Sequence, residues 1–325
     1  MFRTKPRTRV SRNDVARVSS SAPHPCTPGF IAIGPSRTGT TWLHGLLAHR
    51  ACVPRERKET RYFDILYARG PQWHSFYFRH CDGTRPVGEV SPTYFGSEAA
   101  RDRIVRDLPR CKIICTLREP AARAWSQYRK MQRSGLVRNG LEEELRTNEL
   151  LRESSRYGTH LAAWIECFGA RNVGIFFYDD LQADPQRFAD SVFAFLGLNP
   201  LELTPDVIRY LDRNEVPVAA PIRTLAAGVT RLRLWLHGHQ AYRTSAALER
   251  AGVWRLRTRN GPRFAPLAPE VEARVRELLR HEVEEVERLT GRDLSAWKEP
   301  AVDHEEPPAR RAVTMNEMIK PRQMD

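Results

Sequence analysis

The sequence has no long apolar run. Its longest apolar stretches lie at residues 30–33 and 175–178, whereas a membrane-spanning helix needs about 20 apolar residues. Runs this short are typical of buried β-strands. The N-terminal segment also lacks the apolar stretch of a secretory signal. We therefore expect a soluble protein with no membrane span and no secretory signal.

Cysteine is infrequent and shows no CxxC spacing. The six cysteines are Cys26, Cys52, Cys81, Cys111, Cys115 and Cys167. Cys111 and Cys115 lie beside or within a predicted buried strand, where thiols act as small apolar groups. We expect neither a disulfide framework nor a zinc site. A reducing cytoplasm is accordingly the expected location.

Acidic residues are fewer than basic ones. The chain has 52 Lys and Arg against 39 Asp and Glu, a formal net charge of +13. Part of this excess lies in the first 17 residues, where six basic side chains face only Asp14. This favours a solvated basic arm, with contact to an anionic membrane or nucleic acid as the alternative. The remaining charge suits an anionic ligand, and we expect no specific nucleic acid partner.

Composition divides the chain into three parts. Residues 1–28 are predicted to be a disordered basic arm, residues 29–298 one domain, and residues 299–325 a polar C-terminal tail. Within the domain, strands are predicted at residues 30–34, 112–117 and 173–178, followed by helices at residues 40–49, 121–133 and 185–196. A last helix is predicted at residues 270–290. This alternation predicts an α/β fold, a single P-loop-like domain with a central mostly parallel sheet flanked by helices.

The segment Gly34-Pro-Ser-Arg-Thr-Gly-Thr-Thr41 follows the first strand and opens a helix. Backbone N–H groups in such a loop, together with the helix N-terminus, bind anions. The glycine spacing equals that of a Walker A loop, but Thr40 replaces the lysine, and the loop's cation is Arg37. The residues predicted to hold the anion are Ser36, Arg37, Thr38, Gly39, Thr40 and Thr41. The alternative is a simple turn punctuated by glycines.

A second anion site is predicted where the strand at residues 112–117 ends. Arg118 follows this strand, and Ser126 lies two turns into the next helix. A guanidinium and a hydroxyl placed in this way can bind one phosphate group. A Mg²⁺-dependent kinase would need a carboxylate where Arg118 stands. A P-loop phosphotransferase and a non-catalytic nucleotide- or polyanion-binding protein stay open as alternatives.

Together these segments resemble the sulfotransferases that use 3′-phosphoadenosine 5′-phosphosulfate (PAPS), as a bacterial-type relative of the heparan sulfate and carbohydrate sulfotransferases. The resemblance extends over about residues 30–297. It includes Lys58-Glu-Thr-Arg-Tyr-Phe-Asp64 and Glu89-Val-Ser-Pro-Thr-Tyr-Phe95. It implies transfer of a sulfuryl group from PAPS, without a metal, to a hydroxyl or amine of a carbohydrate, glycolipid or small metabolite.

The resemblance also implies roles for individual residues. The glycine loop would bind the 5′-phosphosulfate, with Arg37 stabilising the leaving group, while Arg118 and Ser126 would bind the 3′-phosphate. Glu59 would be the general base. His44 is a competing base and Lys58 a secondary catalytic candidate. The arginines expected to close over the nucleotide are Arg257, Arg259 and Arg263.

Two positions depart from the heparan sulfate enzymes. Arg37 stands where those enzymes usually carry lysine, and it presents a broader fork to phosphate. Val90 stands where they carry a second lysine. The missing cation at position 90 makes a heparan-like acceptor less expected.

Overall fold

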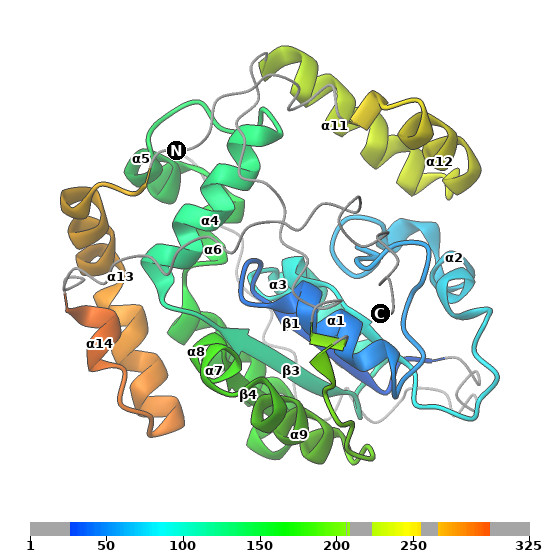
Figure 1. Ribbon diagram of the computed structural model, residues 1–325, viewed down its shortest axis with the longest axis horizontal. Coiled ribbons are helices and arrows are strands. Elements are labelled where there is room, and N and C mark those ends of the chain that lie inside the picture. The colour runs from blue at the N-terminus through cyan, green and yellow to red at the C-terminus, as the bar shows by residue number, and fades with distance from the viewer. Residues whose placement is uncertain (1–26, 206, 209–222, 255–265, 300–325) are drawn as a thin grey trace, which may run out of the picture.

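A four-stranded parallel sheet forms the centre of the protein (Figure 1). The computed structural model describes residues 27–205, 207–208, 223–254 and 266–299. The strands are β1 (Phe30–Gly34), β2 (Gly88–Val90), β3 (Lys112–Leu117) and β4 (Val173–Phe177), in the order β2-β1-β3-β4. All neighbouring pairs are parallel. The predicted α/β fold is confirmed, and β2 is an additional strand of only three residues.

The helices begin and end close to their predicted bounds. The predicted helix at 40–49 is α1 (Thr40–Ala48), that at 121–133 is α4 (Pro120–Arg133), and that at 185–196 is α9 (Pro185–Leu196). The last long helix, α13 (Pro269–Thr290), is closed by Gly291 in the left-handed conformation. The other helices of four or more residues that bear on the site or the core are α2 (Pro71–Ser75), α3 (Glu98–Asp107), α5 (Leu141–Thr147), α6 (Glu149–Glu153), α7 (Tyr157–Phe168), α8 (Tyr178–Ala183), α11 (Arg223–Gly238), α12 (Tyr242–Arg250) and α14 (Ser295–Lys298).

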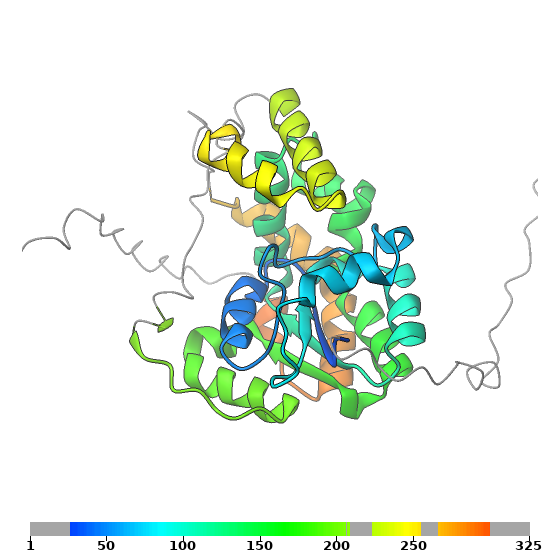
Figure 2. The ribbon, with the colours of Figure 1, turned by 90° about the vertical axis from the view of Figure 1, so that its right-hand side faces the viewer.

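Helices α11 and α12 form a hairpin that stands apart from the main layers, at the top of Figure 2. Its own small core contains Val229, Leu236 and Trp254. His237, near the end of α11, joins the hairpin to the rest of the domain, because its Nε2 lies 2.9 Å from the carbonyl oxygen of Thr60. No helix within the described ranges is both long and apolar enough to cross a membrane.

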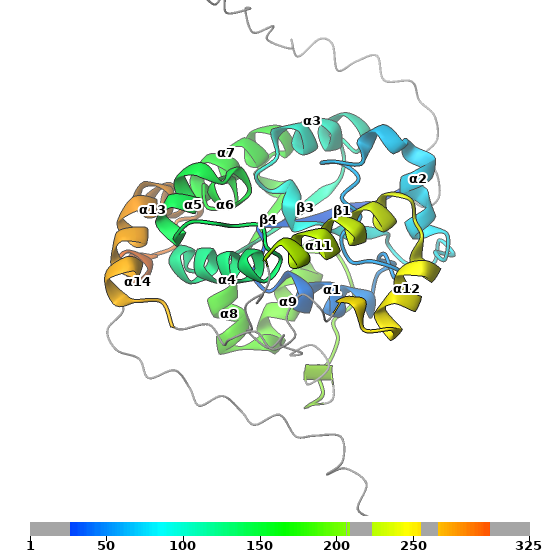
Figure 3. The same cartoon turned by 90° about the horizontal axis from the view of Figure 1, so that it is seen from above.

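Helices cover both faces of the sheet (Figure 3). Side chains alternate along a strand, so Ile31 and Ile33 of β1 pack toward α3, α7 and α13, whereas Phe30 and Ala32 pack toward α1 and α9. Every residue of β1 is buried. This explains why the strands appear in the sequence as short, continuous apolar runs. The carboxyl ends of the strands are left to the loops that carry the predicted site.

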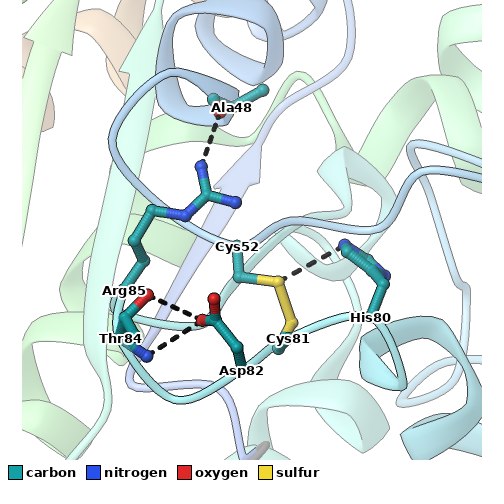
Figure 4. The surroundings of a disulfide bond; sticks show 7 residues. All are labelled: Ala48, Cys52, His80, Cys81, Asp82, Thr84 and Arg85. Carbon is teal, nitrogen blue, oxygen red and sulfur yellow. Dashed lines mark hydrogen bonds between the residues drawn. A yellow bond between two sulfur atoms is a disulfide. The ribbon is translucent and has the colours of Figure 1, made fainter.

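One prediction about the cysteines is wrong. Cys52 and Cys81 form a disulfide (Figure 4), although the sequence predicted none. The two residues are 29 positions apart and belong to no short motif. The backbone N–H of Cys52 donates to the carbonyl oxygen of Pro86, five residues beyond Cys81, so the segment after α1 lies beside the start of β2. Cys111 and Cys115 are buried free thiols, as expected.

Candidate active site

The loop between β1 and α1 has the shape predicted for an anion loop. Gly34 has φ +87°, and a Cβ at this position would lie 2.6 Å from the Cβ of Pro92. Gly39 has φ +83° and is the N-cap of α1. Arg37, at φ 76°, is also in the left-handed region, which is uncommon for a residue with a side chain. The glycines therefore set the turn, and Arg37 takes a conformation that functional loops often impose.

Thr38 has a different role from its neighbours in this loop. Its side chain is buried, and its hydroxyl donates to the Pro35 carbonyl oxygen at 2.7 Å. Oγ1 of Thr38 also lies 2.6 Å from Oγ1 of Thr116 in β3. The Thr38 hydroxyl thus fixes the loop to the sheet. Thr38 is buried, whereas Ser36 and Gly39 are partly exposed.

The two predicted anion segments meet in space. Nε of Arg37 donates to Oγ of Ser126 at 2.9 Å, across 89 positions of sequence. Arg118 lies at the end of β3, with its guanidinium 4.8 Å from the centre of the Tyr178 ring. Within the described residues, no hydrogen bond from the Arg118 guanidinium is found. The hydrogen bond between Arg37 and Ser126 brings the two predicted anion segments together, and we call them the anion region.

Lys58 adds a third segment to this region. Its Nζ donates to Oγ1 of Thr40 at 3.1 Å and lies 3.4 Å from Oγ1 of Thr41. The same Nζ is 3.4 Å from Oε1 of Glu59. Lys58 therefore places a cation directly on the first turn of α1 and holds the proposed general base nearby.

Glu59 lies among basic side chains. Burial disfavours its ionisation, but the charges of Lys58, Lys130, Arg57 and Arg61 outweigh burial and hold the pKa of Glu59 below its usual value. The side chain is still 21% exposed, so a ligand can reach it. Glu59 is therefore a carboxylate at neutral pH, as a proton acceptor must be.

A buried polar network fixes the segment that carries Glu59. The carboxylate of Glu89 in β2 is fully buried and accepts hydrogen bonds from the hydroxyls of Thr60, Ser91 and Tyr94, at 2.5 to 2.7 Å. Nε2 of His74 lies 2.8 Å from its other oxygen. Burial raises the pKa of Glu89, but His74 and the hydroxyls more than reverse this effect. Thr60 is thus held next to Glu59, a positioning role for Glu89 that sequence reasoning missed.

His44 is engaged in a structural contact. Its Nε2 lies 3.1 Å from the Pro54 carbonyl oxygen, which requires that this nitrogen carry the proton. Burial lowers the pKa of His44 to about 4, against the smaller raising effect of that carbonyl. His44 ties α1 to the segment that leads to Lys58. Its placement favours Glu59 over His44 as the base.

Two other predictions concern Val90 and the three arginines expected to close over the nucleotide. Val90 is fully buried in the core cluster beside α1, so this position faces the interior and not the anion region. The three arginines predicted to close over the nucleotide, Arg257, Arg259 and Arg263, lie outside the described residues.

Three further cations were not predicted, two of them near Glu59 and the third near Arg57. Lys130 lies one helical turn after Ser126 on α4, a spacing that could have indicated it. Arg57 precedes Lys58, and burial is the main factor that lowers its pKa. Arg233 of α11 acts electrostatically on Arg57. The last two come together only through the placement of the hairpin.

Known proteins resemble this chain in sequence and fold. Bifunctional heparan sulfate N-deacetylase/N-sulfotransferase 2 of Homo sapiens is 28% identical over 208 residues, covering 57% of this chain and 24% of that protein. The membrane-associated sulfotransferase kil1 of Dictyostelium discoideum is 34% identical over 107 residues, covering 32% of this chain and 23% of that protein. The chain thus spans about a quarter of the length of these curated relatives.

The fold is also found in a solved structure. A sulfotransferase from Alicyclobacillus acidocaldarius superposes with a TM-score of 0.59 at 20% identity, covering 84% of this chain and 99% of that one. At this identity the likeness concerns the fold. A family model for the sulfotransferase domain matches residues 28–213. This match covers more than half of the chain, and the chain therefore belongs to the sulfotransferase domain family.

Proposed function

We propose that this chain transfers the sulfuryl group of PAPS to a hydroxyl or an amine of an acceptor, by in-line displacement with a carboxylate general base. The observation that carries the proposal is the hydrogen bond from Arg37 to Ser126. It joins the loop expected at the 5′-phosphosulfate to the helix expected at the 3′-phosphate. Membership of the sulfotransferase domain family supports the same reaction.

The donor is held by charge and by hydrogen-bond donors. The loop amides, Arg37, Lys58 and the hydroxyls of Thr40 and Thr41 would face the 5′-phosphosulfate. Charge builds on the leaving phosphate as the S–O bond breaks, and fixed donors at that position stabilise the transition state. Arg118, with Ser126, would bind the 3′-phosphate and so distinguish PAPS from ATP.

Glu59 would accept the proton of the acceptor. Its neighbour Lys58 contacts α1, so the carboxylate lies at the edge of the donor region. The proton moves to Glu59 as the acceptor oxygen or nitrogen bonds to sulfur, and the bridging oxygen leaves with the bisphosphate. Arrival of an anionic donor would offset the four surrounding cations and raise the pKa of Glu59, which improves it as a base.

Cations supply the electrostatic stabilisation in this arrangement. The strand β3 is followed by Arg118, where a Mg²⁺-dependent phosphotransferase would place a carboxylate. We therefore propose transfer without a metal. No observation favours the kinase alternative or a protein that only binds nucleotide.

The acceptor side carries its own charge. Arg57 acts electrostatically on Glu59, and Arg233 of α11 acts in turn on Arg57. Arg57 has no ion-pair partner closer than 4 Å within the described ranges, so it is available to an acceptor. We propose an acceptor that carries an anionic group near its nucleophile, within the broader class of carbohydrates, glycolipids and small metabolites.

A cytoplasmic location of the protein stays a prediction.

A mass-spectrometric acceptor screen tests the proposal. The protein is incubated with PAPS and fractionated acceptor extracts, and products are searched for the gain of one sulfuryl group together with formation of adenosine 3′,5′-bisphosphate. We expect such a product with the wild-type protein and its near absence with Glu59→Gln. Turnover of Mg²⁺-ATP in place of PAPS would instead establish the kinase alternative.

A further inference from the structure

Three potential metal ligands lie together away from the anion region. Cys52 follows α1, and His80 and Cys81 belong to the loop that precedes β2. Figure 4 shows the His80 ring directed at the Cys52 sulfur, and its Nε2 is 3.3 Å from that Sγ. The two sulfur atoms and one ring nitrogen all lie within 4.8 Å of one another. A disulfide alone needs no imidazole at its sulfur, so this third group calls for an explanation.

The spacing of these atoms suits a tetrahedral ion. Zinc binds cysteine sulfur at about 2.3 Å and histidine nitrogen at about 2.0–2.1 Å, which places ligand atoms about 3.6–3.8 Å apart. The distance between Nε2 of His80 and Sγ of Cys52 is already close to this value. The two sulfur atoms must separate once their bond is reduced, and the Cα atoms of Cys52 and Cys81 are 5.9 Å apart.

We infer that Cys52, His80 and Cys81 form a redox-gated binding site for a thiophilic divalent cation, Zn²⁺ being the ion that two thiolates and an imidazole suit best. A dithiol reductant transfers two electrons to the Cys52–Cys81 bond and becomes a disulfide itself. The sulfur–sulfur bond breaks and two thiols form. The cation then displaces both thiol protons to solvent, and water fills the fourth position.

The disulfide and the bound cation would each join the segment of Cys52 to the segment of His80 and Cys81. The backbone already pairs there, because Gly88 N–H donates to the Cys52 carbonyl oxygen at 3.0 Å. Arg79, just before His80, also forms an ion pair with Glu56 at 2.5 Å. The segment that starts at Cys52 leads within seven residues to Glu59. The cation would therefore keep this segment anchored under reducing conditions, as the disulfide does under oxidising ones.

Cobalt substitution tests the inference without reference to activity. The full chain is reduced with a dithiol, exchanged anaerobically into dithiol-free buffer and titrated with Co²⁺, whose thiolate complexes give strong charge-transfer absorption. We expect one equivalent to produce this absorption, Zn²⁺ to displace it, and Zn²⁺ to raise the melting temperature of the reduced protein only. Oxidised protein, whose cross-linked peptide is verified by mass spectrometry, should bind neither ion.

Variants assign the ligands. Cys52→Ser and Cys81→Ser should abolish the absorption, and His80→Ala should weaken binding by at least about tenfold. His80→Ala retains the disulfide in its oxidised form, so its folding can be verified independently. Cys167→Ser, which removes an exposed free thiol, is the matched control and should bind normally. Absence of thiolate–cobalt absorption in reduced wild-type protein, or its persistence in Cys81→Ser, would show that the inference is wrong.

Discussion

The proposed donor side, around Arg37 and Arg118, and the proposed acceptor side, around Arg57 and the α11–α12 hairpin, are built differently. On the donor side, Arg37 lies in the loop after β1, Arg118 directly follows β3, and Arg37 is hydrogen-bonded to Ser126 of α4. On the acceptor side, His237 of α11 reaches back to Thr60, 177 positions earlier. Rigid strand ends thus hold the donor groups, whereas contacts between distant helices and loops hold the acceptor groups.

Aromatic and histidine contacts replace strand geometry on the acceptor side. Nδ1 of His237 lies 2.9 Å from the hydroxyl of Tyr242 and 3.3 Å from that of Tyr77, and those two hydroxyls also contact each other. Burial is the main cause that lowers the pKa of His237 to about 4, with Arg57 adding to it. The difference teaches that the donor site can be kept while the hairpin changes the acceptor site.

The largest expected effect on turnover is at Glu59, where the donor side and the acceptor side meet. Glu59→Gln keeps size and polarity but cannot accept a proton, so turnover should fall by roughly 10²–10⁴-fold. PAPS affinity should change little, because Lys58 and the loop still face the donor. Single-turnover kinetics and calorimetry measure the two quantities. A rate loss that tracks lost PAPS affinity would make Glu59 only a structural partner of Lys58.

The next largest effect is a loss of nucleotide affinity, expected from a substitution on the donor side alone. Arg118→Ala should weaken binding of adenosine 3′,5′-bisphosphate by about 10–150-fold, equivalent to the 1.5–3 kcal/mol of a hydrogen bond to a charged group. Affinity for AMP should barely change, since AMP lacks the 3′-phosphate. Arg110→Ala, at the opposite end of β3, is the control in calorimetry. Equal losses for AMP and the bisphosphate would contradict a 3′-phosphate role for Arg118.

The two sides can also be compared through stability. His44 and His237 both have pKa values lowered to about 4 from 6.5 by burial. Between pH 6.5 and 4 the unfolded chain therefore binds more protons than the folded one, so the free energy of unfolding falls as pH decreases. The slope should be about 1.4 kcal/mol per pH unit for each histidine.

Urea unfolding of His44→Gln and His237→Gln across this pH range measures each contribution. Each substitution should reduce the slope by up to that amount, and the double variant should reduce it by the sum. An unchanged slope in both variants would show that neither ring is held neutral by the fold.

The smallest effect is expected at an acceptor-side cation. Arg57→Ala should raise the KM for an anionic acceptor by up to about 5-fold, because partly exposed ion pairs contribute about 1 kcal/mol or less. PAPS affinity and kcat should stay near normal. Steady-state kinetics with the acceptor from the screen measure this split. A larger loss for PAPS than for the acceptor would place Arg57 on the donor side.

The sequence by itself determined the elements that depend on local patterns. The strands β1, β3 and β4, the glycine loop and the long helix α13 agree with their predictions because short apolar runs, glycines and prolines act within a few residues. The predicted positions of Arg37 and Arg118 after β1 and β3, and of Ser126 in the helix that follows β3, came from the strand–loop–helix pattern. The hydrogen bond between Arg37 and Ser126 was not predicted, because it joins residues 89 positions apart.

Tertiary structure decided the rest. The strand β2 has three residues, too few for a periodic pattern, and exists because β1 pairs with it. The Cys52–Cys81 disulfide, the buried Glu89 network and the approach of His237 to Thr60 each join distant parts of the chain. Local sequence patterns do not predict such contacts, because burial and long-range packing create them only when the chain is folded.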